Sequence, residues 1–299
     1  MDQKISAFRE LPGWDQEFIV PRMEIQTAGT AVNVAYPLAR LGVGTGIIGC
    51  VGEDADGRRI IAEAAAAGID TAGIDTVPGM TGISTLLISE NGEYSCITYL
   101  GSSERLDREM VLNHFDLVSD SDFVFFTGYF LSPGLAYEDV RFLMEKAKGE
   151  NKTVLFETGK DPYGWKDRTI REIRDLLRYV DYFIPSLIEA SALSRKDTPE
   201  GIAEDLRKCG AGTVVITLND KGCVTASRDG IHHAPAVLPA KIADTLGAGD
   251  CFDAGFVYGL TQHWELEKIM QFCNTLCSVF ISRQTDRYPT AEEIIKAMP

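Results

Sequence analysis

The sequence predicts an α/β protein built on a doubly wound, mostly parallel β-sheet with helices on both faces and a separate β-hairpin. Three observations support this prediction. Short apolar segments typical of buried strands alternate with longer segments of helical spacing, one hairpin pattern stands apart from this alternation, and no repeat or low-complexity linker interrupts the chain. A strand–helix–strand order favours parallel strands joined by crossover helices. We therefore expect residues 1–299 to form a single domain, with sheet strands near 123–127, 154–157, 182–185 and 214–218.

Composition limits the classes of function. The 299 residues are 45% hydrophobic and 24% charged, as is usual for globular proteins, and the net charge is −15. A strongly acidic chain is unsuited to binding nucleic acid or an anionic membrane. No apolar run approaches the roughly 18 residues of a membrane span, and the N-terminus lacks a signal-peptide pattern. We expect a cytoplasmic protein that acts on a small molecule, and its seven cysteines, which lack Cys-x-x-Cys spacing, to be reduced.

The N-terminal part of the chain predicts a helix, a strand and a second helix. The first helix follows Ala28-Gly29 and runs to about Leu41. A buried strand is expected at 46–51, then an acidic loop at 52–57 that leads into a helix at 58–67. The loop lacks the ligand pattern of an EF-hand, so its acids are better interpreted as turn and cap residues.

Residues 81–100 predict a β-hairpin. Apolar and polar residues alternate on both sides of Glu90-Asn91-Gly92, which has the composition of a tight turn. A two-stranded hairpin can bury only one face, so the other face is expected to meet a substrate or a partner subunit.

The stretch Asp244-Thr245-Leu246-Gly247-Ala248-Gly249-Asp250-Cys251-Phe252 is the chemically most informative part of the chain. The apolar residues from Phe252 to Gly259 predict a deeply buried helix. A turn at Gly247-Ala248-Gly249 would leave backbone N–H groups at the start of that helix without partners, where the helix dipole favours an anion. Asp250 would stand beside this anion site, placed to accept a proton. Taken alone, an Asp at a helix start is more often a cap, and glycines before a helix are more often a turn.

As a whole, this stretch resembles the C-terminal signature of the ribokinase-like (PfkB) carbohydrate kinases. The resemblance implies that Asp250 is the catalytic base and that the amides of Gly247, Ala248 and Gly249 form an anion hole. It further implies a ribokinase-like fold, ATP and Mg²⁺ as cofactors, and a lid from about 11–28 and 81–103. The function expected is that of an ATP-dependent phosphotransferase acting on a hydroxyl of a sugar or sugar-like alcohol.

Other segments match the same family. Ala28–Ala35 resembles Gly-Gly-x-x-x-Asn-x-Ala, which implies that Gly29 and Asn33 bind substrate together with Asp250. The segment 156–161, which contains Glu157, stands where relatives have Asp-x-Asn-x-Arg. Ser186-Leu187-Ile188-Glu189 resembles Asn-x-x-Glu, a motif associated with Mg²⁺ and phosphate; taken alone it is better interpreted as a capping box.

The resemblance also implies a nucleotide site and a second cation site. Thr217-Leu218-Asn219-Asp220-Lys221-Gly222 stands where relatives have Thr-x-Gly-x-x-Gly over the nucleotide phosphates, with Asn219 in the place of a Gly. Nucleotide-binding residues are then expected at Ser186, Thr217, Asn219, Lys221, Gly222, Thr245, Gly247, Gly249 and Asn274. Glu189 would hold Mg²⁺ through water, and Asp244 and Leu246 would belong to a K⁺ site built from backbone carbonyls.

Two alternatives remain open. One is a nucleoside kinase, including a pseudouridine kinase, with Tyr94, Tyr99 or Tyr129 stacking on the base. The other is a catalytically lapsed relative that only binds ligand. In each case a homodimer through the lids is expected.

The resemblance is weakest over residues 1–27. Relatives open with an apolar strand followed by an Asp that binds the sugar hydroxyls, and residues 1–10 do not show this pattern. The expectation is that the chain joins the family near residues 11–22 and that about 20 residues, with the strand and its Asp, are missing. The natural protein would then begin upstream, or this chain would be a poor kinase.

Overall fold

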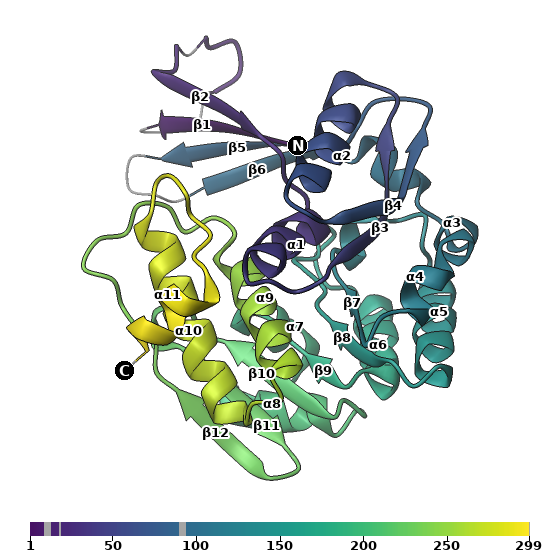
Figure 1. Cartoon of the computed structure of the whole chain (residues 1–299), viewed down its shortest axis with the longest axis vertical. Helices are drawn as coiled ribbons and strands as arrows, with labels where there is room; N and C mark the ends of the chain where they lie inside the picture. Colours follow the sequence, from purple (N-terminus) through teal and green to yellow (C-terminus); the bar gives the residue numbers. More distant parts are fainter. Residues whose placement is uncertain (9–12, 18, 90–93, 299) are drawn as a thin grey trace.

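A computed structural model describes residues 1–8, 13–17, 19–89 and 94–298 (Figure 1). Its largest sheet has six strands in the order β12-β11-β10-β9-β8-β7. Strands β7 to β10 run parallel, whereas β11 and β12 extend the edge as antiparallel strands. The bounds are β7 Phe123–Phe126, β8 Thr153–Phe156, β9 Tyr182–Phe183, β10 Thr213–Thr217, β11 Cys223–Ser227 and β12 Gly230–Ala234. The predicted parallel sheet is therefore confirmed at each of its four expected strands.

Helices cover both faces of this sheet, as predicted. The four main helices of one face are α5 (Tyr137–Gly149), α6 (Asp167–Leu176), α7 (Leu187–Leu193) and α8 (Pro199–Arg207). The other face packs against α1 (Thr30–Arg40), α9 (Ala248–Thr261) and α10 (Leu266–Ser282). The remaining helices are α2 (Ala55–Ala66), α3 (Arg108–Asn113), α4 (Phe115–Ser119) and α11 (Ala291–Ala297).

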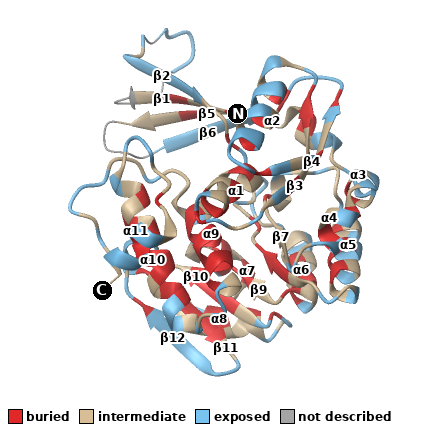
Figure 2. Ribbon diagram, viewed as in Figure 1, coloured by how far each residue is buried: buried red, intermediate tan, exposed pale blue. Residues whose placement is uncertain are grey.

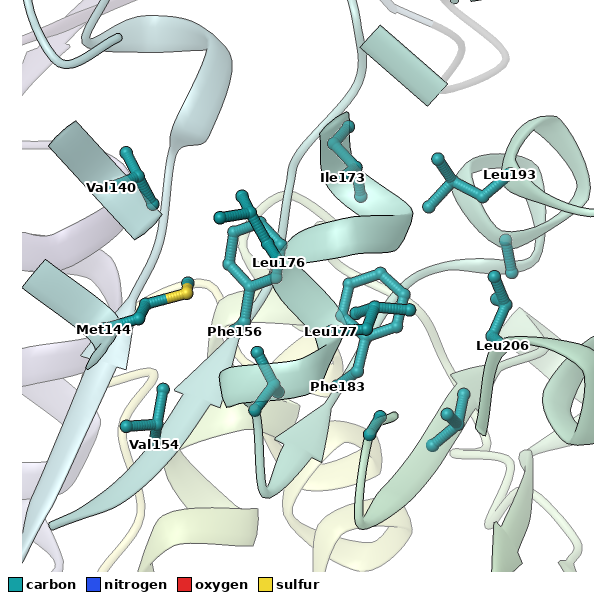
Figure 3. Packing of buried hydrophobic residues seen from close by; sticks show 14 of the residues in the cluster. Val140, Met144, Val154, Phe156, Ile173, Leu176, Leu177, Phe183, Leu193 and Leu206 are labelled. Atoms are coloured by element: carbon teal, nitrogen blue, oxygen red, sulfur yellow. The ribbon is translucent and has the colours of Figure 1, made fainter. Parts of the chain in front are cut away.

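The core consists of two apolar layers separated by the sheet. Successive strand residues point to opposite faces, so Val154 and Phe156 join the layer under α5–α8 while Leu155 joins the layer under α9 and α10. Figure 3 shows Phe156 and Phe183 packed among Leu176, Leu177 and Met144, and their rings lie 5.6 Å apart. Buried residues are concentrated along the large sheet and along α9 and α10 (Figure 2), so the helix that carries Asp250 is fixed within the core.

A separate pair of parallel strands, β3 (Gly46–Gly52) and β4 (Asp70–Val77), lies beyond β7. Over the residues that the structure describes, β7 is paired only with β8, and β3 only with β4. The space between β3 and β7 is a cavity of about 770 Å³ lined by both strands and by apolar residues of α1 and α9. These lining residues include Val34, Leu38, Ile47, Phe125 and Val257. The expected lack of an interior strand thus corresponds to an apolar slot between two unpaired strand edges, which we call the strand slot.

The lid is a four-stranded sheet in the order β2-β1-β5-β6 (Figure 1). Its strands are β1 Asp2–Phe8, β2 Arg22–Gln26, β5 Ile83–Ser89 and β6 Tyr94–Tyr99. The predicted β5–β6 hairpin is confirmed, while its predicted turn at 90–92 falls outside the described residues. The N-terminal end differs from the prediction, because the lid begins at Asp2 and not near residue 11. The lid sheet therefore includes a strand at residues 2–8, whose alternating polar side chains lack the apolar run by which a strand was sought.

The outward face of the lid sheet is apolar. Strand register places Gln3, Ile25, Thr85 and Ile97 on one face, and Ile5, Met23 and Tyr99 lie on the same face. The most exposed of these are Met23, Ile97 and Tyr99, each with more than half of its surface exposed. An exposed apolar face of this kind is typical of an interface.

We therefore predict a homodimer that buries the outward lid face. Ile97→Lys should convert the dimer to a monomer, because an ammonium group would be buried without a partner. Light scattering at micromolar concentration measures this mass. Ile231→Lys, at an exposed position on β12, is the matched control and should leave the mass unchanged. A monomeric wild-type chain would contradict the prediction.

Candidate active site

Helix α9 begins at Ala248, two residues before Asp250, with Gly247 as its N-cap. Gly247 has φ 82° and ψ 7°, a left-handed conformation that favours glycine. Farther along α9, Gly255 and Gly259 let α10 approach closely. A Cβ at these positions would lie 2.9 Å from Leu276 Cδ2 and 2.7 Å from Ile269 Cγ1. The small residues of the predicted signature therefore form the turn, and those that follow hold the helix against α10.

Three backbone amides at this helix start are free to bind an anion. Ala248 N–H donates to Thr245 O (3.2 Å) and Cys251 N–H donates to Gly247 O (2.9 Å). The N–H groups of Gly247, Gly249 and Asp250 have no acceptor within the described part of the chain. Unpartnered amides and the positive end of the helix dipole give this turn the chemistry to bind an anion. The predicted amide of Ala248 is engaged within the turn, and that of Asp250 is available in its place.

Asp250 is half-buried, and among the described residues one neutral side chain donates to it. Asn33 Nδ2 donates to Asp250 Oδ2 (2.9 Å) from the first turn of α1, which Gly29 opens with φ 139°. Burial, with the nearby charges of Glu157 and Asp2, raises the pKa of Asp250 to about 7, and the Asn33 hydrogen bond opposes the shift. A carboxyl group with this pKa can accept a proton near neutral pH.

Further acids lie near Asp250. Glu157 accepts hydrogen bonds from the Thr127 hydroxyl and from the amides of Gly128 (2.9 Å) and Gly159 (2.8 Å). Burial raises the pKa of Asp253, and the charges of Glu157, Asp250 and Glu189 add to that shift. Among the residues described here, no group of His, Cys, Asp or Glu side chains is arranged to hold a metal ion by itself.

A cavity of about 430 Å³ opens beside this centre. It is lined by Asp2, Gln26 and Thr27 from the lid and the segment after it, by Asn33 from α1, and by Leu246 and Gly247 from the signature. Burial raises the pKa of Asp2. The expectation that the chain lacks the lid carboxylate is therefore corrected, since Asp2 shares the cavity with Asn33. The alternating pattern Asp2-Gln3-Lys4-Ile5-Ser6 was the signal that could have identified it.

Five of the predicted nucleotide residues lie at the carboxyl ends of β9 and β10: Ser186, Thr217, Asn219, Lys221 and Gly222. Ser186 and Thr217 form a parallel bridge, and the turn 219–221 follows directly. Asn219 adopts φ 54°, the left-handed conformation expected where relatives have Gly, and Gly222 has φ 91°. Lys221 is exposed at this turn, and Thr245 is exposed beside the α9 turn. Ligands of α/β sheets bind at such strand ends.

Three predicted residues, Ser186, Glu189 and Asn274, also make structural contacts. Ser186 and Glu189 form the capping box of α7, with Ser186 N–H donating to Glu189 Oε2 (2.8 Å) and Glu189 N–H donating to Ser186 Oγ (3.4 Å). Burial raises the pKa of Glu189. Asn274 Nδ2 donates to Ala234 O (3.2 Å) and Pro235 O (2.9 Å), so this group supports the segment after β12.

The tyrosines proposed to stack on a nucleoside base lie apart. Tyr99 is on the outward lid face, and Tyr129 packs edge-on against Phe130 and Phe156. Tyr94 is on the inward face, with Lys160 Nζ 5.7 Å from its ring. Only Tyr94 of these three is placed toward the cavity side of the lid.

Asp244 is bound by two cationic side chains. Its Oδ2 accepts from Lys4 Nζ (2.8 Å) and from Arg287 Nη1 (3.0 Å). These contacts and the Leu246 N–H bond to Oδ1 hold the pKa of Asp244 below its usual range, although burial opposes the shift. Neither Lys4 nor Arg287 was identified as a site residue from the sequence, because each lies far from Asp244 along the chain.

Comparison with known proteins agrees with this geometry. The model of the pfkB family carbohydrate kinases matches residues 10–293. A 5-dehydro-2-deoxygluconokinase of Geobacillus thermodenitrificans is 29% identical over 277 residues, which is 89% of this chain and 82% of that protein. Ribokinase of Arabidopsis thaliana, solved with ribose and ATP, superposes with a TM-score of 0.84 at 21% identity, over 99% of this chain and 95% of that one. A putative ribokinase II of E. coli, solved with ATP and Mg²⁺, gives 0.81 at 22% identity, over 98% and 94%.

A parallel sheet with a lid, and a carboxylate beside free amides at a helix start, fit the class of enzymes that transfer phosphoryl groups. The chain belongs to the pfkB family of carbohydrate kinases and has the ribokinase-like fold. In the described residues, none of the helices has the length and apolar character needed to cross a membrane.

Proposed function

We propose that the protein transfers the γ-phosphoryl group of ATP to a hydroxyl group of a sugar or sugar acid. The observation that supports this most strongly is the position of Asp250, which touches Asn33 and adjoins the free amides of Gly247 and Gly249. Substrate hydroxyls would bind Asp2 and Asn33 in the 430 Å³ cavity. The γ-phosphate would bind the amides at the start of α9.

In this mechanism Asp250 accepts the proton of the attacking hydroxyl. The free amides of Gly247, Gly249 and Asp250 stabilise negative charge on the transferring group, and the lid excludes water so that phosphate does not pass to water. Mg²⁺ would neutralise charge on the nucleotide phosphates. Mg²⁺ is usually held by one or two carboxylates, phosphates and water, which fits the buried Glu189 and its neighbour Glu157 better than an all-protein site.

The test is a panel of substrates assayed with ATP and Mg²⁺ by ADP release. The panel contains ribose, other sugars, 5-dehydro-2-deoxygluconate, uridine, inosine and pseudouridine. Turnover of a sugar or sugar acid supports the proposal. Turnover restricted to nucleosides would replace it by a nucleoside kinase, and binding by calorimetry without turnover would identify a lapsed relative.

The pKa of Asp250 predicts the pH dependence of the reaction. The carboxyl group must be deprotonated to act as a base, so kcat/KM should fall as the pH decreases through about 7. Asn33→Leu should move this acidic limb to higher pH, because it removes the hydrogen bond that favours the carboxylate. A limb near the ordinary carboxyl pKa of about 4 would contradict the assignment.

Glu189→Gln tests the metal role against the capping box. If Glu189 orders the water shell of Mg²⁺, the variant should need several-fold more Mg²⁺ for half-maximal turnover. Glu293→Gln is the matched control, since Thr290 and Glu293 form the same capping box at α11. Equal loss of thermal stability in both variants with unchanged Mg²⁺ titrations would leave Glu189 with the capping role alone.

A further inference from the structure

The loop before α9 directs three oxygen atoms at one cationic group. Arg287 Nη2 donates to the backbone carbonyls of Asp244 (2.9 Å) and Leu246 (3.1 Å), and Nη1 donates to Asp244 Oδ2 (3.0 Å). The guanidinium carbon lies 4.0 Å from the ring centre of Phe280, which the planar cation covers. Only 16% of the Arg287 side chain is exposed. The loop therefore has a cation built into it, contributed by a residue more than 40 positions away.

The chemistry of this cluster is that of a cation site. Two carbonyl oxygens and a carboxylate oxygen from one short loop are ligands that would suit a bare cation. Here the guanidinium binds both carbonyls and the carboxylate, with the planar geometry that Lys cannot reproduce. The K⁺ site expected around Asp244 and Leu246 is thus filled by the chain itself.

The orientation of the peptide group links Arg287 to the anion site. In a trans peptide the C=O and the N–H point in opposite directions. The Leu246 carbonyl is held by Arg287, so the N–H of the same peptide group, that of Gly247, is directed away from Arg287. That N–H is one of the three free amides at the start of α9. Arg287 consequently fixes the direction of an anion-binding donor without contacting the anion.

We propose that Arg287 is a positioning residue that replaces a bound monovalent cation, so that this enzyme binds the γ-phosphate and turns over without K⁺. The expected effect on turnover rests on the proposed kinase function, whereas the expected effect on ATP binding does not. The effect on binding concerns the difference in affinity between ATP and ADP, because only ATP presents a γ-phosphate to the Gly247 amide.

The first experiment uses the wild-type chain. ATP and ADP affinities are measured by calorimetry in buffers containing either K⁺ or tetramethylammonium, and turnover is measured in the same buffers if a substrate is known. The ATP affinity, the ADP affinity and the turnover should each agree within twofold between the K⁺ and the tetramethylammonium buffers. A tenfold or greater gain in ATP affinity or turnover on adding K⁺ would overturn the proposal.

The second experiment uses Arg287→Ala, with Arg287→Lys as the more conservative variant. Removal of the guanidinium should weaken ATP binding and turnover by roughly 10- to 100-fold and leave ADP affinity nearly unchanged. This is less than the roughly 10²- to 10³-fold lost when an oxyanion donor itself is removed, because the Gly247 amide remains. Guanidinium or K⁺ at tens of millimolar should restore part of the loss, and Arg287→Lys should retain an intermediate activity.

Arg283→Ala is the matched control, because Arg283 binds Asp286 O and Glu293 nearby and does not contact the 244–247 loop. Arg283→Ala should keep the wild-type ATP affinity, and added guanidinium or K⁺ should not change it. A folded Arg287→Ala chain with wild-type ATP affinity, or an equal loss for ATP and ADP without rescue, would overturn the proposal. If the Arg287 variants do not fold, the comparison of K⁺ with tetramethylammonium in the wild-type chain alone decides whether Arg287 replaces the cation. Absence of turnover on every substrate, with a cation-independent preference for ATP, would reject the kinase function and retain the role of Arg287.

Discussion

Replacing Asp250 by Asn is expected to lower turnover by roughly 10²- to 10⁴-fold while ATP still binds. The amide has the size of the carboxylate and keeps a contact with Asn33, but it cannot accept the proton of the attacking hydroxyl. The amides that would bind phosphate belong to the backbone and remain in place. Single-turnover kinetics measures the chemical step, and calorimetry with ATP measures the binding that should persist.

Asp253→Asn is the control for this variant. Asp253 lies one turn later on α9, and burial raises its pKa, which favours its neutral form, so the neutral amide is the closest replacement in size and charge. Its turnover should stay within a few-fold of wild type. Near-normal turnover of Asp250→Asn would remove Asp250 from the mechanism, whatever the result for Asp253→Asn.

Filling the strand slot is expected to give the second large effect, an increase in the stability of the fold. A segment ahead of Met1 that adds an apolar strand between β3 and β7 should raise the free energy of unfolding by several kcal/mol. Each apolar side chain buried there contributes about 1.5–3 kcal/mol, and the strand would give the free edges of β3 and β7 their ladder partners. Met1 is a suitable point of attachment, because it packs in one cluster with Ala35 and Ile47, which also line the slot.

The measurement compares thermal midpoints of the 299-residue chain with and without such a segment. An increase on the order of 5–10 °C is expected for a protein of this size. A Gly/Ser segment of equal length is the control and should leave the midpoint unchanged. Equal midpoints for the apolar and the Gly/Ser segments would show that the slot does not admit a strand.

Local pattern was enough to predict most of the fold. The strands β8 to β10 are largely buried on both faces, and β7 is half-buried beside the strand slot, so their sequences are short apolar runs that alternate with helices. The signature 244–252 was informative because small residues, an acid and an apolar helix occur together within nine positions. Both features can be recognised without knowing which distant segments meet.

The parts that were missed depend on long-range contacts. Strand β1 has polar residues at every second position because that face meets the cavity, so it lacks the apolar run of an interior strand. Asp2 becomes a site residue only through its place beside Asn33. Arg287 resembles any surface arginine until the fold brings it to the carbonyls of Asp244 and Leu246. The strand slot is likewise a property of packing and not of any one segment.

The contact between Lys4 and Asp244 restricts how the lid sheet can move relative to the loop before α9. Lys4 is on β1, an interior strand of the lid sheet, and its side chain is only 6% exposed where it meets the loop before α9. Moving Lys4 away from Asp244 would leave the buried ammonium group without this partner, which costs free energy until water replaces it. The ion pair therefore holds the middle of the lid sheet against the loop before α9. A hinge motion of the whole lid sheet would have to separate Lys4 from Asp244. A lid movement that leaves β1 in place would keep this ion pair intact.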